Sequence, residues 1–121
     1  MTTSSVSSVS SVSSSPACWL GNAFSLQMLE TDGYVKVTSL DCVQAGELFL
    51  ARKGQSCIGH PDTAAVVSDI LGINIPCARV NVTLHKGDIL IVAQLTGGRL
   101  PEGATKLPDG FKIKWKVVSI E

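Results

Sequence analysis

The sequence has no excess of charge of either sign, because its 121 residues include 10 lysines and arginines and 10 aspartates and glutamates. A protein that holds a long nucleic-acid duplex by bulk charge carries a clear positive excess, since each contact neutralises a phosphate. The neutral balance therefore excludes that class, and we expect no DNA partner. It leaves room for a small nucleotide ligand that is bound by a few local arginines.

Long hydrophobic runs are also missing. The sequence contains no stretch of about 18 apolar residues, the length that a transmembrane helix needs. Its N-terminal segment has neither the basic nor the apolar region of a secretory signal. We therefore expect a cytoplasmic protein, in a prokaryotic cell or in the host cytoplasm of a virus, with no membrane partner.

The four cysteines, Cys18, Cys42, Cys57 and Cys77, form no C-x-x-C pair. With no export signal and a low density of cysteine, we expect four reduced and mostly buried thiols rather than disulfides. His60 follows Cys57 by three residues, but no cysteine pair at zinc-binding spacing stands near a histidine. We therefore expect no structural zinc site, and no other metal or cofactor.

Residues 1–15 differ in composition from the rest of the chain, since they hold nine serines, three valines and no charged residue. Serine competes with backbone hydrogen bonding, and three valines offer too little apolar surface to bury. We expect this tail to be disordered; the alternative is a strand that pairs as the chain folds. Residues 16–121 then form one domain, which is long enough to bury a modest core.

The rest of the sequence alternates between strand patterns and helix patterns, which predicts the fold class α/β (α+β). Its expected form is a central mixed β-sheet of about five strands with flanking helices. Ser25 is a suitable N-cap for a brief helix at residues 26–29. Strands are expected at residues 18–24, 34–40, 47–52, 79–84, 89–95 and 111–120. Residues 41–46 are expected to form a turn or one helical turn, residues 53–55 a turn that leads into 56–58, and residues 85–88 a hairpin turn.

The clearest helix begins after His60. Pro61 suits its first turn, apolar residues recur at helical spacing up to Leu71, and Gly72 suits its C-terminal end. Residues 96–110 then hold four glycines and two prolines without any periodicity. A structureless loop of this length is typically a functional lid or a disordered segment.

Polar groups stand at two places where a predicted helix begins. Asn22 and Ser25 precede the brief helix, and His60 precedes the long one. A helix N-terminus presents N–H groups and a positive dipole to an anion such as phosphate. The alternative is ordinary capping for Asn22 and Ser25, and a surface histidine with no ligand for His60.

Three further charged residues are candidates for ligand contacts. Arg79 stands at the start of a predicted strand, while Arg99 and Glu102 lie in the glycine-rich loop. Each is equally compatible with a solvent-facing role. A loop that closes over a ligand would bring Arg99 and Glu102 to it.

Four segments occur in this order: NAFSLQML at 22–29, IGHPDTA at 58–64, ARVNV at 78–82 and RLPEG at 99–103. Together they resemble the viral type III anti-CRISPR ring nuclease family and its bacterial and archaeal relatives. The resemblance extends from about residue 19 to the last predicted strand. It also implies a helix at 104–109, shorter than that of the family.

The resemblance implies a twofold homodimer that binds cyclic tetra-adenylate, the second messenger made by type III CRISPR complexes. It implies metal-independent cleavage of this ring to linear di-adenylate with a 2′,3′-cyclic phosphate, which switches off the signal. His60, Glu102 and Arg99 match the catalytic residues of the family. The ligand-contacting positions of the family are matched by Asn22, Ser25, Gln27, Arg79 and Gln94.

These residue types suit the implied chemistry. The ribose 2′-hydroxyl is the nucleophile, a histidine can protonate the leaving oxygen, and arginine can neutralise the phosphate. Two alternatives stay open: a binding protein that sequesters the ring without cutting it, and an interaction protein that uses the serine tail as a tether. A viral inhibitor and a host regulator are equally compatible with the sequence.

Overall fold

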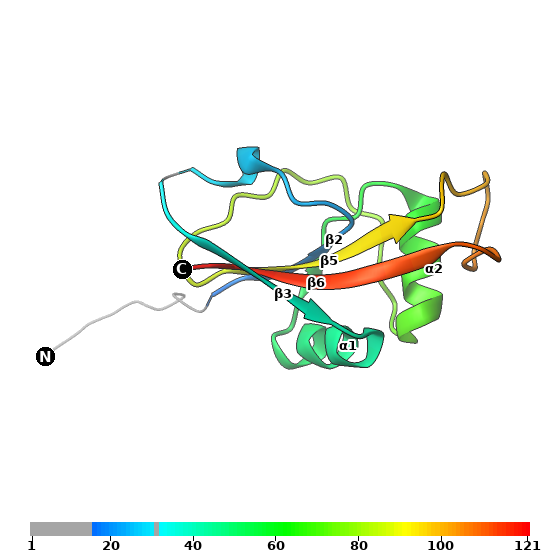
Figure 1. Ribbon diagram of the computed structural model, residues 1–121, viewed down its shortest axis with the longest axis horizontal. Helices are drawn as coiled ribbons and strands as arrows, with labels where there is room; N and C mark the ends of the chain where they lie inside the picture. The colour runs from blue at the N-terminus through cyan, green and yellow to red at the C-terminus, as the bar shows by residue number, and fades with distance from the viewer. Residues whose placement is uncertain (1–15, 31) are drawn as a thin grey trace, which may run out of the picture.

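The structure is a computed structural model that describes residues 16–30 and 32–121. The predicted disordered tail at 1–15 lies outside the described residues. Within these described residues, five strands and three helical elements follow one another (Figure 1). They are β2 (Cys18–Gly21), the 3-10 helix η2 (Leu26–Met28), β3 (Val35–Leu40), α1 (Cys42–Ala51), β4 (Gln55–Ser56), α2 (Pro61–Leu71), β5 (Ile89–Thr96) and β6 (Lys112–Ile120).

The strands form one mixed sheet in the order β3-β6-β5-β2-β4. β5 and β6 pair antiparallel over their whole length, and β3 pairs antiparallel with the far side of β6. β2 runs parallel to both of its neighbours, β5 and β4. The predicted α+β class with a five-stranded mixed sheet is therefore confirmed.

The prediction of a strand at 47–52 is wrong, and the helical turn expected as one alternative at 41–46 is the start of a longer helix, α1, which spans Cys42–Ala51. Asp41 accepts a hydrogen bond from the N–H of Gln44 at 2.7 Å, and the Gln44 side chain accepts one from the N–H of Asp41 at 3.0 Å. This reciprocal capping satisfies two N–H groups that a helix start leaves unpaired. Ala45 and Phe49, four positions apart, then bury one face of the helix.

The predicted strand at 79–84 is also wrong. This segment crosses the sheet without strand pairing, apart from a single parallel bridge between Leu84 and Leu29. The turn at 85–88 is present, but it is closed by Asp88, whose carboxylate accepts hydrogen bonds from the N–H groups of His85 and Ala17. The alternating pattern of 79–84 reflects packing of Val82 and Leu84 onto the sheet, not membership of it.

Two smaller predictions of element boundaries and type are wrong, and the prediction of the long helix is confirmed. β2 ends at Gly21, earlier than the predicted boundary at residue 24, and residues 104–109 form turns and bends rather than a helix. The long helix is confirmed as α2, with Pro61 in its first turn and Gly72 at φ 68° beyond its end. The left-handed conformation of Gly72 is one that glycine adopts at little steric cost.

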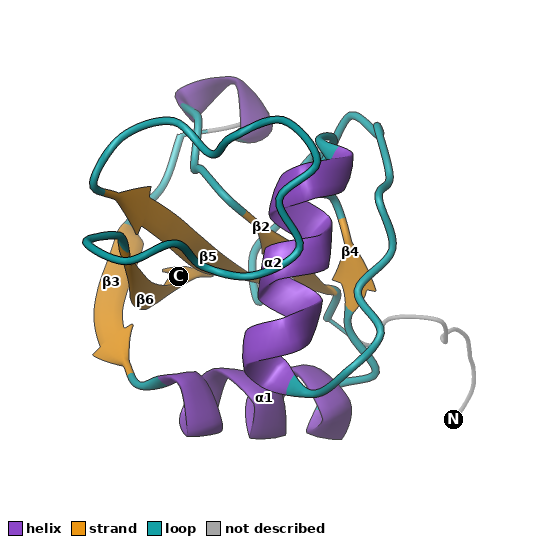
Figure 2. Ribbon diagram, turned by 90° about the vertical axis from the view of Figure 1, so that its right-hand side faces the viewer, coloured by secondary structure: helices purple, strands orange, loops and turns teal. Residues whose placement is uncertain are grey.

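The two faces of the sheet carry separate apolar clusters. On one face α1 and α2 pack over residues that include Leu20 and Ile91, both 0% exposed. On the other face the segments before β3 and before β5 cover Leu90 and neighbouring side chains. In Figure 1, α1 lies below the sheet and the segment with η2 lies above it; in Figure 2, α1 runs across the lower end of α2.

All four cysteines are free thiols, as predicted. Burial raises the pKa of the Cys18 and Cys57 thiols to about 11, since the charged thiolate is poorly solvated inside the protein. Cys77 is exposed, so the prediction of mostly buried thiols is wrong at this position. Within the described residues, no helix is long and apolar enough to cross a membrane.

Candidate functional site

Three of the predicted site residues meet at one edge of the sheet. Asn22 follows β2, His60 follows β4, and Arg99 follows β5. Because β2 runs parallel to both neighbours, the carboxyl ends of these three strands point to the same edge. Asn22, His60 and Arg99 line one cavity of about 280 Å³ there, together with Thr63, Leu95, Gly98 and Leu100.

This edge is also where the chain leaves the sheet in two directions. After β2 it runs toward η2 on one face, and after the neighbouring β4 it runs into α2 on the other face. In sheets with parallel strands, such a divergence opens a crevice beyond the carboxyl ends, and ligands bind there. The position of the cavity therefore follows from the topology.

His60 is the N-cap residue of α2, but its side chain makes no capping hydrogen bond. Its backbone is extended, with φ −119° and ψ 123°, and the residue is exposed. The ring is thus presented at the positive end of a helix of 11 residues. This arrangement is suited to an anionic ligand, because the N-terminal end of the helix favours negative charge.

Arg79 is held against the backbone next to His60. Its Nε donates a hydrogen bond to the carbonyl oxygen of Gly59 at 2.8 Å, and the adjacent Ala78 N–H donates to Ile58 at 2.8 Å. A Cβ on Gly59 would lie 3.2 Å from Cγ of Arg79, so a larger residue there would require the Arg79 side chain to shift by a few tenths of an ångström. Arg79 does not line the cavity; its guanidinium is anchored beside it through Gly59.

The glycine-rich loop is tied to the first turn of α2. The N–H of Gly103 donates a hydrogen bond to the Asp62 carboxylate at 3.1 Å. Gly97, at φ 111°, allows the two ends of the loop to approach, since a Cβ there would lie 2.9 Å from the backbone of Gly110. Glu102 stands next to the tied residue, but it is exposed and does not line the cavity.

A second cavity adjoins the first and shares Asn22 with it. It has a volume of about 310 Å³ and an apolar floor made by Val37, Val92 and Val118. Gln94 and Lys116 supply polar groups at its border. Two predicted ligand contacts, Asn22 and Gln94, therefore face the same space.

The sequence profile of the STIV B116-like family matches residues 18–112. This chain belongs to that family. The solved structure of B116 of Sulfolobus turreted icosahedral virus (STIV) is similar to it, at 29% sequence identity and a TM-score of 0.73, covering 85% of this chain and 98% of the viral one. No curated protein matches the chain.

The family match shows which residues of this B116-like chain correspond to the family sequence profile. The matched residues 18–112 contain every predicted site residue, from Asn22 to Glu102. They leave out the serine-rich segment and all of β6 except its first residue, Lys112. The two matches support a viral family that is related to the one the sequence resembles.

Two predicted ligand contacts of the B116-like chain lie apart from the cavities. The Ser25 hydroxyl accepts a hydrogen bond from the N–H of Gln27 at 3.2 Å and so caps η2. Both residues are exposed, and neither lines the cavities that Asn22 borders. Ser25 therefore acts as the N-cap of η2, which is the alternative expected for it from the sequence.

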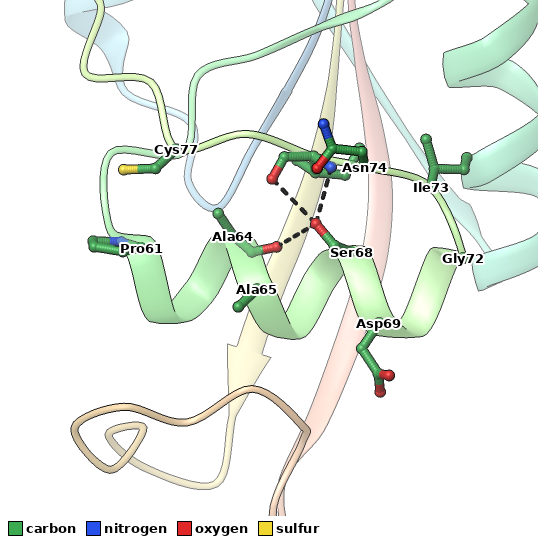
Figure 3. Close-up of a pocket in the computed structure, with 10 residues that line it drawn as sticks. Pro61, Ala64, Ala65, Ser68, Asp69, Gly72, Ile73, Asn74 and Cys77 are labelled. Carbon is green, nitrogen blue, oxygen red and sulfur yellow. Dashed lines mark hydrogen bonds between the residues drawn. The ribbon is translucent and has the colours of Figure 1, made fainter.

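A cavity of about 630 Å³ is an open groove along α2, and none of the predicted site residues lines it (Figure 3). Its central polar group, the Ser68 hydroxyl, is bonded to Ala64 at 2.8 Å and to both backbone groups of Ile75. These bonds fasten the chain after α2 to the helix. The polar group in this groove therefore has a structural role that needs no ligand.

Sequence reasoning missed two polar residues at the site, Asp62 and Lys116. Asp62 stands two positions after His60, where an acidic residue in a first helical turn has a sufficient explanation in the helix dipole. Lys116 alternates with core residues of β6 and has the pattern of any solvent-facing strand residue. No signal in the sequence distinguishes either of them from ordinary surface charge. Within the described residues, no group of three or more potential metal ligands occurs.

Proposed function

We propose that this protein is a metal-independent ring nuclease of type III CRISPR signalling. It binds cyclic tetra-adenylate at the interface of a homodimer and cuts it to linear di-adenylate with a 2′,3′-cyclic phosphate. The observation that carries the proposal is the single cavity lined by Asn22, His60 and Arg99, which come from three separate parts of the chain. An amide, an imidazole and a guanidinium are the groups that a nucleotide phosphodiester needs.

The reaction needs a nucleophile, a proton donor and a counter-charge. The substrate supplies the first, because its ribose 2′-oxygen attacks the neighbouring phosphorus and loses its proton to water. The bond from phosphorus to the 5′-oxygen breaks, and the His60 imidazolium gives its proton to that oxygen. Arg99 pairs with the phosphate oxygens, whose negative charge grows in the transition state.

Arg79 and Glu102 are assigned roles beside these groups. Arg79 has its Nε on Gly59, which leaves the outer nitrogens of the guanidinium to meet a phosphate near His60. Glu102 is carried by the loop that Asp62 holds at the start of α2. When this loop orders over the ligand, the carboxylate approaches the imidazolium and stabilises its protonated form.

The homodimer follows from the symmetry of the ligand. A ring with four equivalent phosphates can lie on a twofold axis, which brings one His60 of each protomer to one of two opposite phosphates. Two cuts then yield two equal products. A single protomer contains one such histidine, so cleavage at both sites of a bound ring needs a second copy.

The test is incubation of the protein with cyclic tetra-adenylate in the presence of a chelator, followed by chromatography of the products. The expected result is loss of the ring and appearance of di-adenylate with a cyclic phosphate. A ring that is retained on the protein but stays intact would instead establish the second candidate, a sequestering protein. The exposed position of Glu102, outside the cavity, favours that second candidate. A protein that neither binds nor cuts the ring would refute both.

A further inference from the structure

Charge is distributed unevenly over the sheet, although the whole chain is neutral. The strands β3, β5 and β6 together carry four lysines and no acidic residue. Three of these lysines, Lys112, Lys114 and Lys116, lie on β6 at every second position. They therefore point to the same face of the sheet, spaced by about 7 Å.

The face to which these lysines point is the one opposite α1 and α2. The intervening residues of β6, Ile113 and Trp115, pack into the cluster under α1 and α2. Lys114 is paired in register with Gln94, and Lys116 with Val92. Since Gln94, Val92 and Lys116 all line the cavity that shares Asn22 with the His60 cavity, the lysine row borders the proposed site.

These lysines have no acidic partner in the described part of the chain. The ion pairs found there both involve His85, and Lys116 donates only to the Ser39 hydroxyl, at 3.2 Å. Like charges on one strand repel one another, so the row is more stable with an anion beside it. Lysines also discourage strand edges from aggregating, and β6 extends beyond the end of β3 at Leu40. The experiment below separates these two explanations.

We propose that Lys114 and Lys116 bind a phosphate of the ring that is not cut, and this rests on the proposed function. A ring of four phosphates that presents two of them to the His60 residues of a dimer leaves two others, one for each protomer. Those phosphates stay charged throughout the reaction and need a cation in the ground state as much as in the transition state. Such a contact strengthens binding and leaves the chemical step unchanged.

The test measures binding of cyclic tetra-adenylate at a series of salt concentrations, in the His60→Ala background so that the ring stays intact. The double variant Lys114→Gln and Lys116→Gln is expected to raise Kd about tenfold. The slope of log K against log salt should fall by about 0.7, the contribution of one single-strand phosphate contact. Lys36→Gln is the matched control. Ser39 of β3 lies on the same face as Lys116, to which it is hydrogen-bonded, and Lys36 of the same strand points to the opposite face. It should leave both Kd and slope unchanged.

Cleavage by the same double variant in the otherwise native chain gives a second readout. A raised KM with an unchanged kcat at saturation supports a contact to an uncut phosphate, whereas a lowered kcat overturns it. Rescue of Kd by Lys114→Arg and Lys116→Arg is expected, because arginine also pairs with phosphate. An unchanged Kd and salt slope in the glutamine variant, with binding otherwise normal, overturns this inference alone. Failure of the His60→Ala parent and the native chain to bind the ring overturns the proposed function as well.

Discussion

The two faces of the sheet are covered in different ways. One face lies under α1 and α2, and its residues, such as Leu20 and Ile91, are completely buried. The other face is covered by irregular segments that stop short of one end, where Val37 is 55% exposed and Lys116 borders a cavity. The comparison teaches that regular secondary structure secures the fold on one face, while incomplete cover leaves room for a ligand on the other.

The largest difference between the two faces is expected when a side chain is truncated on the helix-covered face. Ile91→Ala is expected to lower the free energy of unfolding by about 2–5 kcal/mol, because it leaves a cavity in a filled core. Denaturant titration measures the loss. Val37→Ala on the open face is the control and should change stability by at most about 0.5 kcal/mol. Equal losses at the two sites would mean that the open face is covered after all.

His60→Ala tests the edge where the two faces meet. We expect single-turnover cleavage of cyclic tetra-adenylate to fall at least about a hundredfold, the usual loss when a general acid is removed. Affinity for the ring and dimer formation should stay close to those of the native protein. Cleavage by the variant at the native rate would remove His60 from the reaction.

Arg99→Ala and Glu102→Ala test the loop that borders the open side. Arg99→Ala should weaken binding and slow cleavage, about tenfold each, because a guanidinium meets phosphate before and during the reaction. Glu102→Ala should mainly slow cleavage, since His60 loses the carboxylate that approaches it when the loop closes over the ligand. Affinity and single-turnover rate are measured across pH for both variants. If Glu102→Ala binds poorly but cleaves normally at saturation, the loop is only a binding clamp.

The smallest expected effect concerns the thiols. At pH 8 the exposed Cys77 should react with an alkylating reagent much faster than Cys18 and Cys57, whose pKa of about 11 leaves little thiolate. The raised pKa values also stabilise the folded state below pH 9, and this contribution is lost as the pH rises from 9 toward 11. Mass spectrometry of the alkylated native protein checks the order of reaction. Simultaneous labelling of all three thiols would indicate that the sheet opens easily.

The parts of the fold that could be predicted from the sequence are those determined by local signals. Pro61 and Gly72 bound α2, the apolar run of β5 identifies a central strand, and the alternation of lysine with apolar residues identifies β6. Residues 47–52 are apolar enough for a buried strand, so their pattern predicts a strand where the structure has the helix α1. The reciprocal capping hydrogen bonds of Asp41 and Gln44 favour the helix. Local composition does not determine which of two periodicities the tertiary structure will use.

The candidate site was predictable only in part, because half of the predicted site residues line the two adjoining cavities and the other half do not. Asn22, His60 and Arg99 lie far apart in sequence, and only the parallel pairing of β2 with β4 and β5 brings them to one edge. Ser25 stands closer to Asn22 in sequence than either of the others, yet it caps η2 away from the cavity. Long-range strand pairing, which no short motif encodes, therefore decides the composition of the site.

The hydrogen bond from the Gly103 N–H to Asp62 gives the loop a reporter of its own. An amide proton exchanges with solvent only while its hydrogen bond is open, so the exchange rate at Gly103 measures the fraction of time that the loop is undocked from α2. A ligand that holds the loop down lowers that rate without touching Gly103. The exchange rate of this one backbone amide thus measures, in solution, how firmly the fifteen-residue loop docks on α2 as substrate enters and product leaves.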